Sequence, residues 1–134
     1  ILAVQLAYGC ELSENSAENL LETCFTEENI QKESIQKYGL RLVKLTQTNV
    51  DKIDDIIENN SKNWEIKRIA LTDKLVLRIA IAEMLHIEDV PQKVSISEAV
   101  EISKVFGTKE SGPFVNGILD AVYKKINKGE YILN

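Results

Sequence analysis

The sequence has 134 residues, which fits one domain that can bury a core without disulfides or metals. A hydrophobic share of 44% and a charged share of 28% are ordinary for globular proteins and exclude general disorder. No run of 18 apolar residues is present, so we expect no membrane-spanning helix, and the net charge of -5 argues against binding nucleic acid over the whole surface. Cys10 and Cys24 lack metal-site spacing and make no disulfide framework, which favours reduced cysteines in a cytoplasmic protein.

The basic residues are unevenly distributed along the chain. Residues 62–78 carry Lys62, Lys67, Arg68, Lys74 and Arg78, and the C-terminal end adds Lys124, Lys125 and Lys128. A local basic surface can bind phosphate on a chain that is acidic as a whole. The alternative is a set of scattered lysines on solvated helix faces.

Apolar spacing in the first half of the chain predicts three helices. The first covers residues 1–12, and the second begins after Ser13 or Ser16, either of which can cap it. The third is a single amphipathic helix from about Glu33 to Asn59. Short polar residues that follow it compete for backbone hydrogen bonds and end it.

The second half contains the stretch around which we expect the fold to be organised. Residues 75–85 form a helix that is apolar on nearly every face, so it belongs at the centre of a bundle. Thr72 or Asp73 can cap its start. Pro91, which lacks an N–H and restricts the residue before it, predicts that the helix ends near residues 87–89.

Two further helices are predicted after Pro91. Ser95 and Glu98 fit a capping box, which would start a helix with a buried stripe of Ile96, Ala99, Val100 and Phe106. Gly107 ends that helix.

The last helix begins at Ser111, with Pro113 inside its first turn. Helical spacing continues through Asn116 and Gly117, although that dipeptide also occurs in hairpins. A glycine inside a helix costs about 1 kcal/mol relative to alanine, so we expect a close neighbour at Gly117.

The chain offers no set of residues suited to catalysis or to metal binding. His86 is the only histidine, and a metal site needs more ligands than it can supply. We expect it at a helix end, where its positive form would suit the helix dipole. No glycine-rich loop that could cradle a phosphate is present. By elimination we expect a binding protein without a cofactor, and not an enzyme.

Three spaced motifs resemble the NusB family of bacterial transcription antitermination factors. They are residues 77–84, residues 90–101 with Val90-Pro91 at their start, and Lys104-Val105-Phe106-Gly107 followed by residues 114–120. Ala3 to Tyr8 is similar to the first helix of that family. Residues 14–63 match only in helical pattern.

The resemblance implies an all-α bundle of about six to seven helices in a single domain, residues 1–134. It implies two small helical subdomains, residues 1–60 and 64–128. Members of the family bind boxA RNA together with the ribosomal protein NusE, and assemble an antitermination complex on RNA polymerase during ribosomal RNA transcription. We expect the same function here.

Carried over residue by residue, the resemblance implies two groups of contacts. The RNA contacts are Tyr8, Lys74, Glu110, Ser111 and Phe114, and the NusE contacts are Asp73, Arg78 and Glu83. An exposed tyrosine suits stacking on an unpaired base. Structural alternatives stand beside these roles: Tyr8 can be a core or rim aromatic, and Phe114 can be a core residue. Arg78 can be an internal tie to Glu83 or Glu98, because a charge in so apolar a helix must be paired.

The sequence departs from the family pattern in two places. Family members usually carry an arginine-rich segment ahead of the first helix, and the sequence starts after that point. Either the segment is missing from this sequence or RNA binding is weaker. The family also tends to have alanine near Ser103 and often a basic residue near Pro113, so the RNA-facing loop is altered.

Two other functions remain open. One is the similar RNA-binding domain at the front of ribosomal-RNA cytosine methyltransferases, although such a domain would continue into an α/β region and this sequence stops at Asn134. The other is a helical oligomerisation module without RNA. Formation of a homodimer that hides Tyr8 and Phe114 would favour it.

Overall fold

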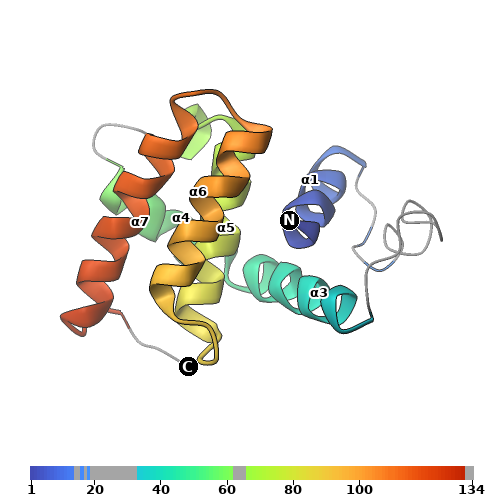
Figure 1. Ribbon diagram of the computed structural model, residues 1–134, viewed down its shortest axis with the longest axis horizontal. Helices are drawn as coiled ribbons and strands as arrows, with labels where there is room; N and C mark the ends of the chain where they lie inside the picture. The colour runs from blue at the N-terminus through green and yellow to red at the C-terminus, as the bar shows by residue number, and fades with distance from the viewer. Residues whose placement is uncertain (14–15, 17, 19–32, 62–65, 132–134) are drawn as a thin grey trace.

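The computed structural model describes residues 1–13, 16, 18, 33–61 and 66–131. Within them every regular element is a helix, which confirms the predicted all-α class (Figure 1). The elements are α1 (Leu2–Ser13), α3 (Glu33–Thr48), α4 (Val50–Asn60), the short 3-10 helix η2 (Ile66–Arg68), α5 (Leu71–His86), α6 (Gln92–Phe106) and α7 (Ser111–Asn127). In this part of the chain no helix is long and apolar enough to cross a membrane.

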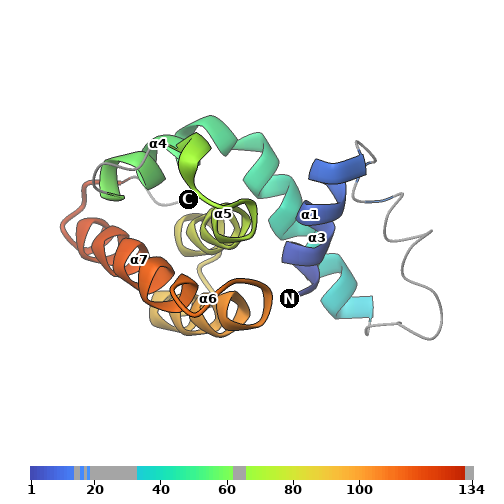
Figure 2. The ribbon, with the colours of Figure 1, turned by 90° about the horizontal axis from the view of Figure 1, so that it is seen from above.

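Helix α5 lies at the centre of the bundle, as its sequence predicts (Figure 2). It contacts α1 and α3 on one side, α4 on another, and α6 and α7 on a third. Leu77, Ile81 and Ala82 have no exposed surface at all. Full burial of a Leu or Ile side chain contributes about 1.5–3 kcal/mol, so packing onto α5 is a main source of stability.

The remaining helices form two groups around α5. Helices α6 and α7 pack against each other as a hairpin, and α1 packs against α3 on the other side of α5 (Figures 1 and 2). Helix α4 packs on α5 and α7. The division into subdomains of residues 1–60 and 64–128 stays a prediction. One continuous apolar core joins both groups.

The predicted single helix from Glu33 to Asn59 is wrong, because the chain changes direction at Asn49. The backbone there has φ -111° and ψ 19°, outside helical values. The Asn49 side-chain amide donates a 2.8 Å hydrogen bond to the Leu45 carbonyl, to which its backbone N–H also donates. A short polar side chain that bonds its own backbone in this way competes with helix continuation. Apolar periodicity runs across the break, so the pattern alone does not show it.

The starts of α5 and α6 also differ from the predictions. Helix α5 follows Ala70, without a side-chain cap from Thr72 or Asp73. Helix α6 follows Pro91 directly, and its first turns are closed by the Pro91 carbonyl, which accepts from the Ser95 N–H at 3.3 Å. Ser95 therefore lies inside the helix. The predicted capping box is wrong, because the Ser95 hydroxyl donates its hydrogen bond to a residue of another helix.

The predicted helix ends are mostly confirmed. Helix α5 ends at His86, α6 stops at Gly107, and α7 begins at Ser111 and continues through Asn116 and Gly117. The close neighbour expected at Gly117 is wrong: this residue is exposed, and nothing lies within 4 Å of the position that a Cβ would take. The predicted helix after Ser16 lies mostly outside the described residues.

Candidate functional site

Tyr8 is displayed on the surface of α1. Ala3, Val4 and Leu6 of the same helix are buried against the core, whereas Tyr8 is 40% exposed. An exposed aromatic ring offers a flat face on which a base can stack. Such stacking contributes about 1–3 kcal/mol per base to binding, as measured by replacing the ring with alanine. The structure therefore leaves Tyr8 available for the predicted RNA contact.

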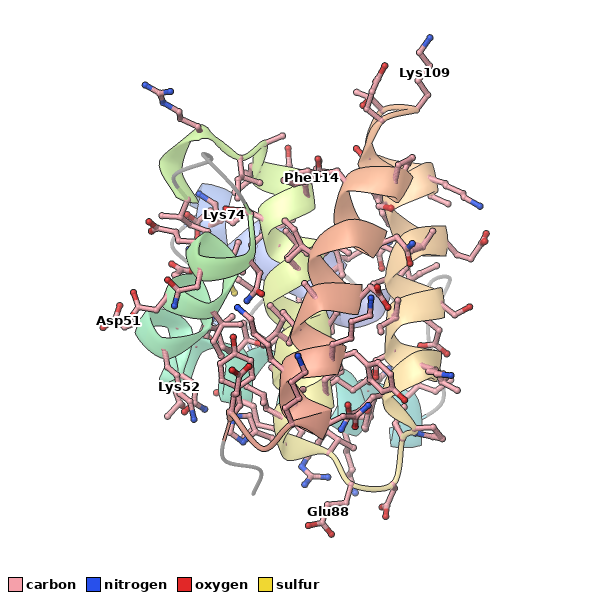
Figure 3. All side chains as sticks on the ribbon, turned by 90° about the vertical axis from the view of Figure 1, so that its left-hand side faces the viewer. Asp51, Lys52, Lys74, Glu88, Lys109 and Phe114 are labelled. Atoms are coloured by element: carbon pink, nitrogen blue, oxygen red, sulfur yellow. The ribbon has the colours of Figure 1, made fainter. Side chains whose placement is uncertain are left out.

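Asp73 and Lys74 lie in the first turn of α5, and both are half-buried. An acidic residue in a first turn is favourable, because the free N–H groups there carry partial positive charge. The Asp73 Oδ1 atom is buried and has no hydrogen-bond partner among the described residues. Lys74, Phe114 and Lys109 lie toward the same end of the bundle (Figure 3).

The α6–α7 loop is held by a compact set of hydrogen bonds. The Thr108 N–H donates to Ser111 Oγ at 3.0 Å, and the Thr108 hydroxyl donates to Glu110 Oε2 at 3.1 Å. A Cβ at Gly107 would lie 2.2 Å from Ser111 Oγ, so the loop needs glycine there. Ser111 is only 3% exposed, whereas Glu110 is exposed. Of the predicted RNA contacts, Ser111 is thus the one that the structure withdraws from solvent.

Phe114 lies one turn into α7 and packs partly against the core. It is half-buried, so it combines a structural role with an accessible portion. Phe106, predicted to lie in the buried stripe of α6, is instead 38% exposed, and its neighbour Val105 is 68% exposed. Phe106 is therefore a second aromatic on the surface near the α6–α7 loop. The sequence did not indicate this, because Phe106 has helical spacing with core residues.

Arg78 forms a two-point ion pair with Asp54 of α4. Its Nε and one terminal nitrogen each donate to an Asp54 carboxylate oxygen at 2.8 Å. The two side chains are 14% and 20% exposed, so the pair is largely shielded from solvent. The prediction that Arg78 must be paired is confirmed, but the predicted partners, Glu83 and Glu98, are wrong. Asp54 gave no signal in the sequence, because it lies among other acidic residues of α4.

Glu83 lies inside the bundle and is 7% exposed. Its Oε2 accepts a 2.5 Å hydrogen bond from the Tyr38 hydroxyl of α3, and its Oε1 accepts one of 2.5 Å from the Ser95 hydroxyl of α6. Burial raises the pKa of Tyr38, and the hydrogen bond to Glu83 raises it further. Glu83 thus ties three helices together. Because its carboxylate is turned inward, we do not carry it into the proposed NusE surface.

His86 ends α5 as predicted. Burial lowers the pKa of its imidazole, and the charge of Lys52 lowers it further, which disfavours the positive form that would suit the helix dipole. The described part of the chain holds no group of three or more His, Cys, Asp or Glu side chains that could bind a metal ion.

Comparisons of the sequence with known proteins point to one family. The model of the NusB family matches residues 1–124. The chain is 43% identical over 133 residues to transcription antitermination protein NusB of Desulforapulum autotrophicum, covering 96% of this chain and 92% of that protein. It is 38% identical over 125 residues to the protein of the same name in Chloroherpeton thalassium, covering 93% of this chain but only 59% of that longer protein.

Comparisons of the structure agree. NusB of T. maritima superposes with a TM-score of 0.82 and 33% sequence identity, over 97% of this chain and 93% of that one. A chain from a structure of antitermination factors NusB and NusE in complex with dsRNA superposes with a TM-score of 0.79 and 26% identity, over 92% of this chain and 91% of that one. The similarity therefore extends over nearly the whole described fold.

Proposed function

This chain belongs to the NusB family, and we propose that it acts as a transcription antitermination factor that binds RNA together with the ribosomal protein NusE. The observation that carries the proposal is the likeness over most of the chain to a NusB protein found with NusE and dsRNA. Its relatives are named as antitermination proteins and not as enzymes, so we propose that it works by binding alone.

More specifically, we propose that the RNA is the boxA element of ribosomal RNA operons. The assembly would form on RNA polymerase in the cytoplasm. The net charge of -5 makes general attraction to RNA unfavourable, so affinity must come from local contacts. Tyr8 and the exposed part of Phe114 supply ring surface for stacking, and Lys74 supplies a positive charge.

We propose Asp73 as the NusE contact nearest to these residues. Asp73 lies in the first turn of α5 and is only half-buried, so part of its side chain can accept a hydrogen bond from a partner. Glu110, exposed in the α6–α7 loop, stays a proposed RNA contact. Arg78 supports the proposed NusE contacts only indirectly, because it is bound to Asp54 and fixes α5 against α4.

The proposal is tested by fluorescence anisotropy of labelled boxA RNA, with and without NusE, at two salt concentrations. We expect binding with NusE that weakens as salt rises, since phosphate contacts release counterions. Tyr8→Ala should weaken binding by about tenfold and Tyr8→Phe should preserve it, because stacking needs only the ring.

A second pair of variants tests the placement of the surface. Lys74→Ala should weaken RNA binding and reduce its salt dependence. Lys128→Ala should do neither, because Lys128 follows α7, and the C-terminal end of α7 and the start of α5 lie at opposite ends of the bundle (Figure 1). Absence of saturable RNA binding with NusE present would contradict the proposal. A homodimer that loses Tyr8 exposure and binds no RNA would favour the oligomerisation module instead.

A further inference from the structure

A groove of about 590 Å³ runs along the solvent side of the α6–α7 pair. The two helices pack against each other as a hairpin (Figure 1). Apolar side chains form the floor of the groove, namely Ile96 and Val100 of α6 and Pro113 of α7. None of the proposed RNA or NusE contacts lines it. A groove between two helices offers apolar surface that a third helix can cover.

Two exposed valines of α6 extend this apolar surface. Val94 is 42% exposed, and Val105 is exposed to a still greater degree. Val94 lies one helical turn from Ser97, and Val105 lies one turn from Glu101, so each valine borders a residue that lines the groove. Apolar surface with a polar rim is typical of sites where another protein binds.

A lysine lies at each end of the groove and reaches from α6 to α7. The alkyl stem of Lys104 lies over Gly112, where a Cβ would be 3.7 Å from the Lys104 Cγ atom. The Lys93 Nζ atom lies 5.7 Å from the centre of the Tyr123 ring. Both lysines line the groove. At the rise of an α-helix, about 16 Å of α6 separate the two positions, which is the length of about three turns.

The ends of the groove are positively charged. A ring face carries no net charge, so the contact with Tyr123 does not neutralise Lys93. Lys104 pairs with Glu101 at 3.1 Å, but the two side chains are 60% and 71% exposed, and an ion pair in contact with water is weak and readily exchanged. The groove therefore combines an apolar floor with positive ends, and most of the positive charge lies at Lys93.

We propose that the α6–α7 groove binds an amphipathic helix of a partner protein, about three turns long, with an acidic residue at each end of its apolar face. The apolar face packs on Ile96, Val100 and Pro113, and the acidic residues meet Lys93 and Lys104. The proposal goes beyond RNA and NusE binding and does not depend on either.

The chemistry of the groove favours a helix over RNA and over an extended peptide. Single-stranded RNA is commonly bound by stacking on aromatic side chains, and none of the described residues that line the groove is aromatic. An extended peptide binds by adding a strand to a sheet edge, and the described part of the chain contains helices alone.

The probe is a set of stapled helical peptides of about 15 residues, which share a glutamate at each end of the apolar face and vary Leu, Ile and Phe along it. The staple keeps each peptide helical, so the cost of ordering it is already met. The peptides are titrated into the full chain, without RNA or NusE. We expect saturable shifts of the NMR signals from the Val94, Ile96 and Val100 methyl groups, and none from Val43 of α3, which does not line the groove. No saturable shift of the groove signals with any peptide of the set would overturn the proposal.

Charge reversal tests the ends of the groove. Replacing the peptide glutamates by lysines should weaken binding at least about tenfold, because like charges would then face Lys93 and Lys104. Lys93→Glu should weaken binding of the glutamate peptides and strengthen that of the lysine peptides. Lys52→Glu is the matched control, since Lys52 is exposed on α4, apart from α6 (Figure 3). Equal binding of the two kinds of peptide, or equal effects of Lys93→Glu and Lys52→Glu, would also overturn the proposal.

Two other occupants of the groove would give different results. If a second copy of this chain fills it, the same methyl signals shift as the concentration of the free chain rises. If RNA fills it, boxA RNA shifts these signals without any peptide. Either result would assign the groove to that occupant and overturn the proposal of a partner helix. Because the peptide titration contains no RNA or NusE, its failure leaves the proposed function untouched, and the reverse also holds.

Discussion

The middle of α5 and the middle of α7 each contain residues that suit their helix poorly. Helix α5 carries the charges of Arg78 and Glu83 in an otherwise apolar run, and α7 carries Gly117 within a regular helix. In α5 both charges meet partners from other helices, Asp54 for the arginine and Tyr38 and Ser95 for the glutamate. In α7 nothing lies within 4 Å of the space beside the glycine.

The difference between the two regions comes from burial. A charge removed from water loses its hydration, so α5 can carry Arg78 and Glu83 only with partners in place. Gly117 is exposed, and it costs the helix only backbone entropy, about 1 kcal/mol. An unusual residue in a helix therefore indicates a contact only where the position is buried. The two regions should respond in opposite directions to mutation.

The largest expected effect is at the ion pair of α5. Asp54→Ala leaves the Arg78 charge without its partner, and we expect a loss of about 3 kcal/mol in the free energy of unfolding. This is the low end of the range for buried pairs, because Asp54 is 20% exposed. Urea denaturation measures it. Asp51→Ala is the matched control, since Asp51 is an exposed residue of the same helix (Figure 3). Equal effects of the two variants would contradict the role of the pair.

The second effect concerns the hydrogen bonds of Glu83. Ser95 is 2% exposed and donates to this carboxylate. Ser95→Ala removes a charge-assisted hydrogen bond and should lower the free energy of unfolding by about 2 kcal/mol. Ser97→Ala, at an exposed position of α6, should change it by less than about 0.5 kcal/mol. If Ser95 were the helix cap predicted from the sequence, the loss of stability in Ser95→Ala would be the same with and without Glu83→Gln. Because Ser95 donates to Glu83, we expect the two changes to be coupled instead.

The third effect is a pH dependence at Tyr38. Burial and the bond to Glu83 raise the pKa of its hydroxyl in the folded state, so the unfolded state loses that proton first, near pH 10. The stability that this tyrosine contributes is therefore present below about pH 10 and is lost as pH rises above it, by up to about 1.4 kcal/mol per pH unit. Tyr38→Phe should flatten this decline when unfolding is measured from pH 9 to 11. An equally steep decline in the variant would show that other groups cause it.

Much of the fold could be predicted because local chemistry marks it. Pro91, Gly107 and Ser111 each act on the backbone near them, and the helix boundaries at those points are confirmed. The break at Asn49 could not be predicted, since apolar spacing continues across it and the side-chain bond to Leu45 depends on the conformation reached. Ser95 looks the same in sequence whether it caps a helix or donates to a glutamate twelve residues earlier.

The site was less accessible to sequence reasoning than the fold. Apolar spacing identifies which positions are inside, but it does not choose among similar polar residues. Asp51, Asp54 and Asp55 lie on one helix, and only packing against α5 makes Asp54 the partner of Arg78. The RNA-binding residues came from resemblance to a family, and they stay predictions, although the structure leaves Tyr8 exposed.

The smallest effect should have the opposite sign. Gly117→Ala adds a Cβ in open space on the exposed side of α7, so no contact is strained. Alanine has the higher helix propensity and restricts the unfolded chain, and we expect a gain of about 0.4–1 kcal/mol in the free energy of unfolding. Gly107→Ala is the contrasting variant, because its Cβ would lie 2.2 Å from Ser111 Oγ and should destabilise the α6–α7 loop. A loss of stability in Gly117→Ala, measured by urea denaturation, would show that a close contact requires glycine at this position. The contrast drawn between α5 and α7 would then fail.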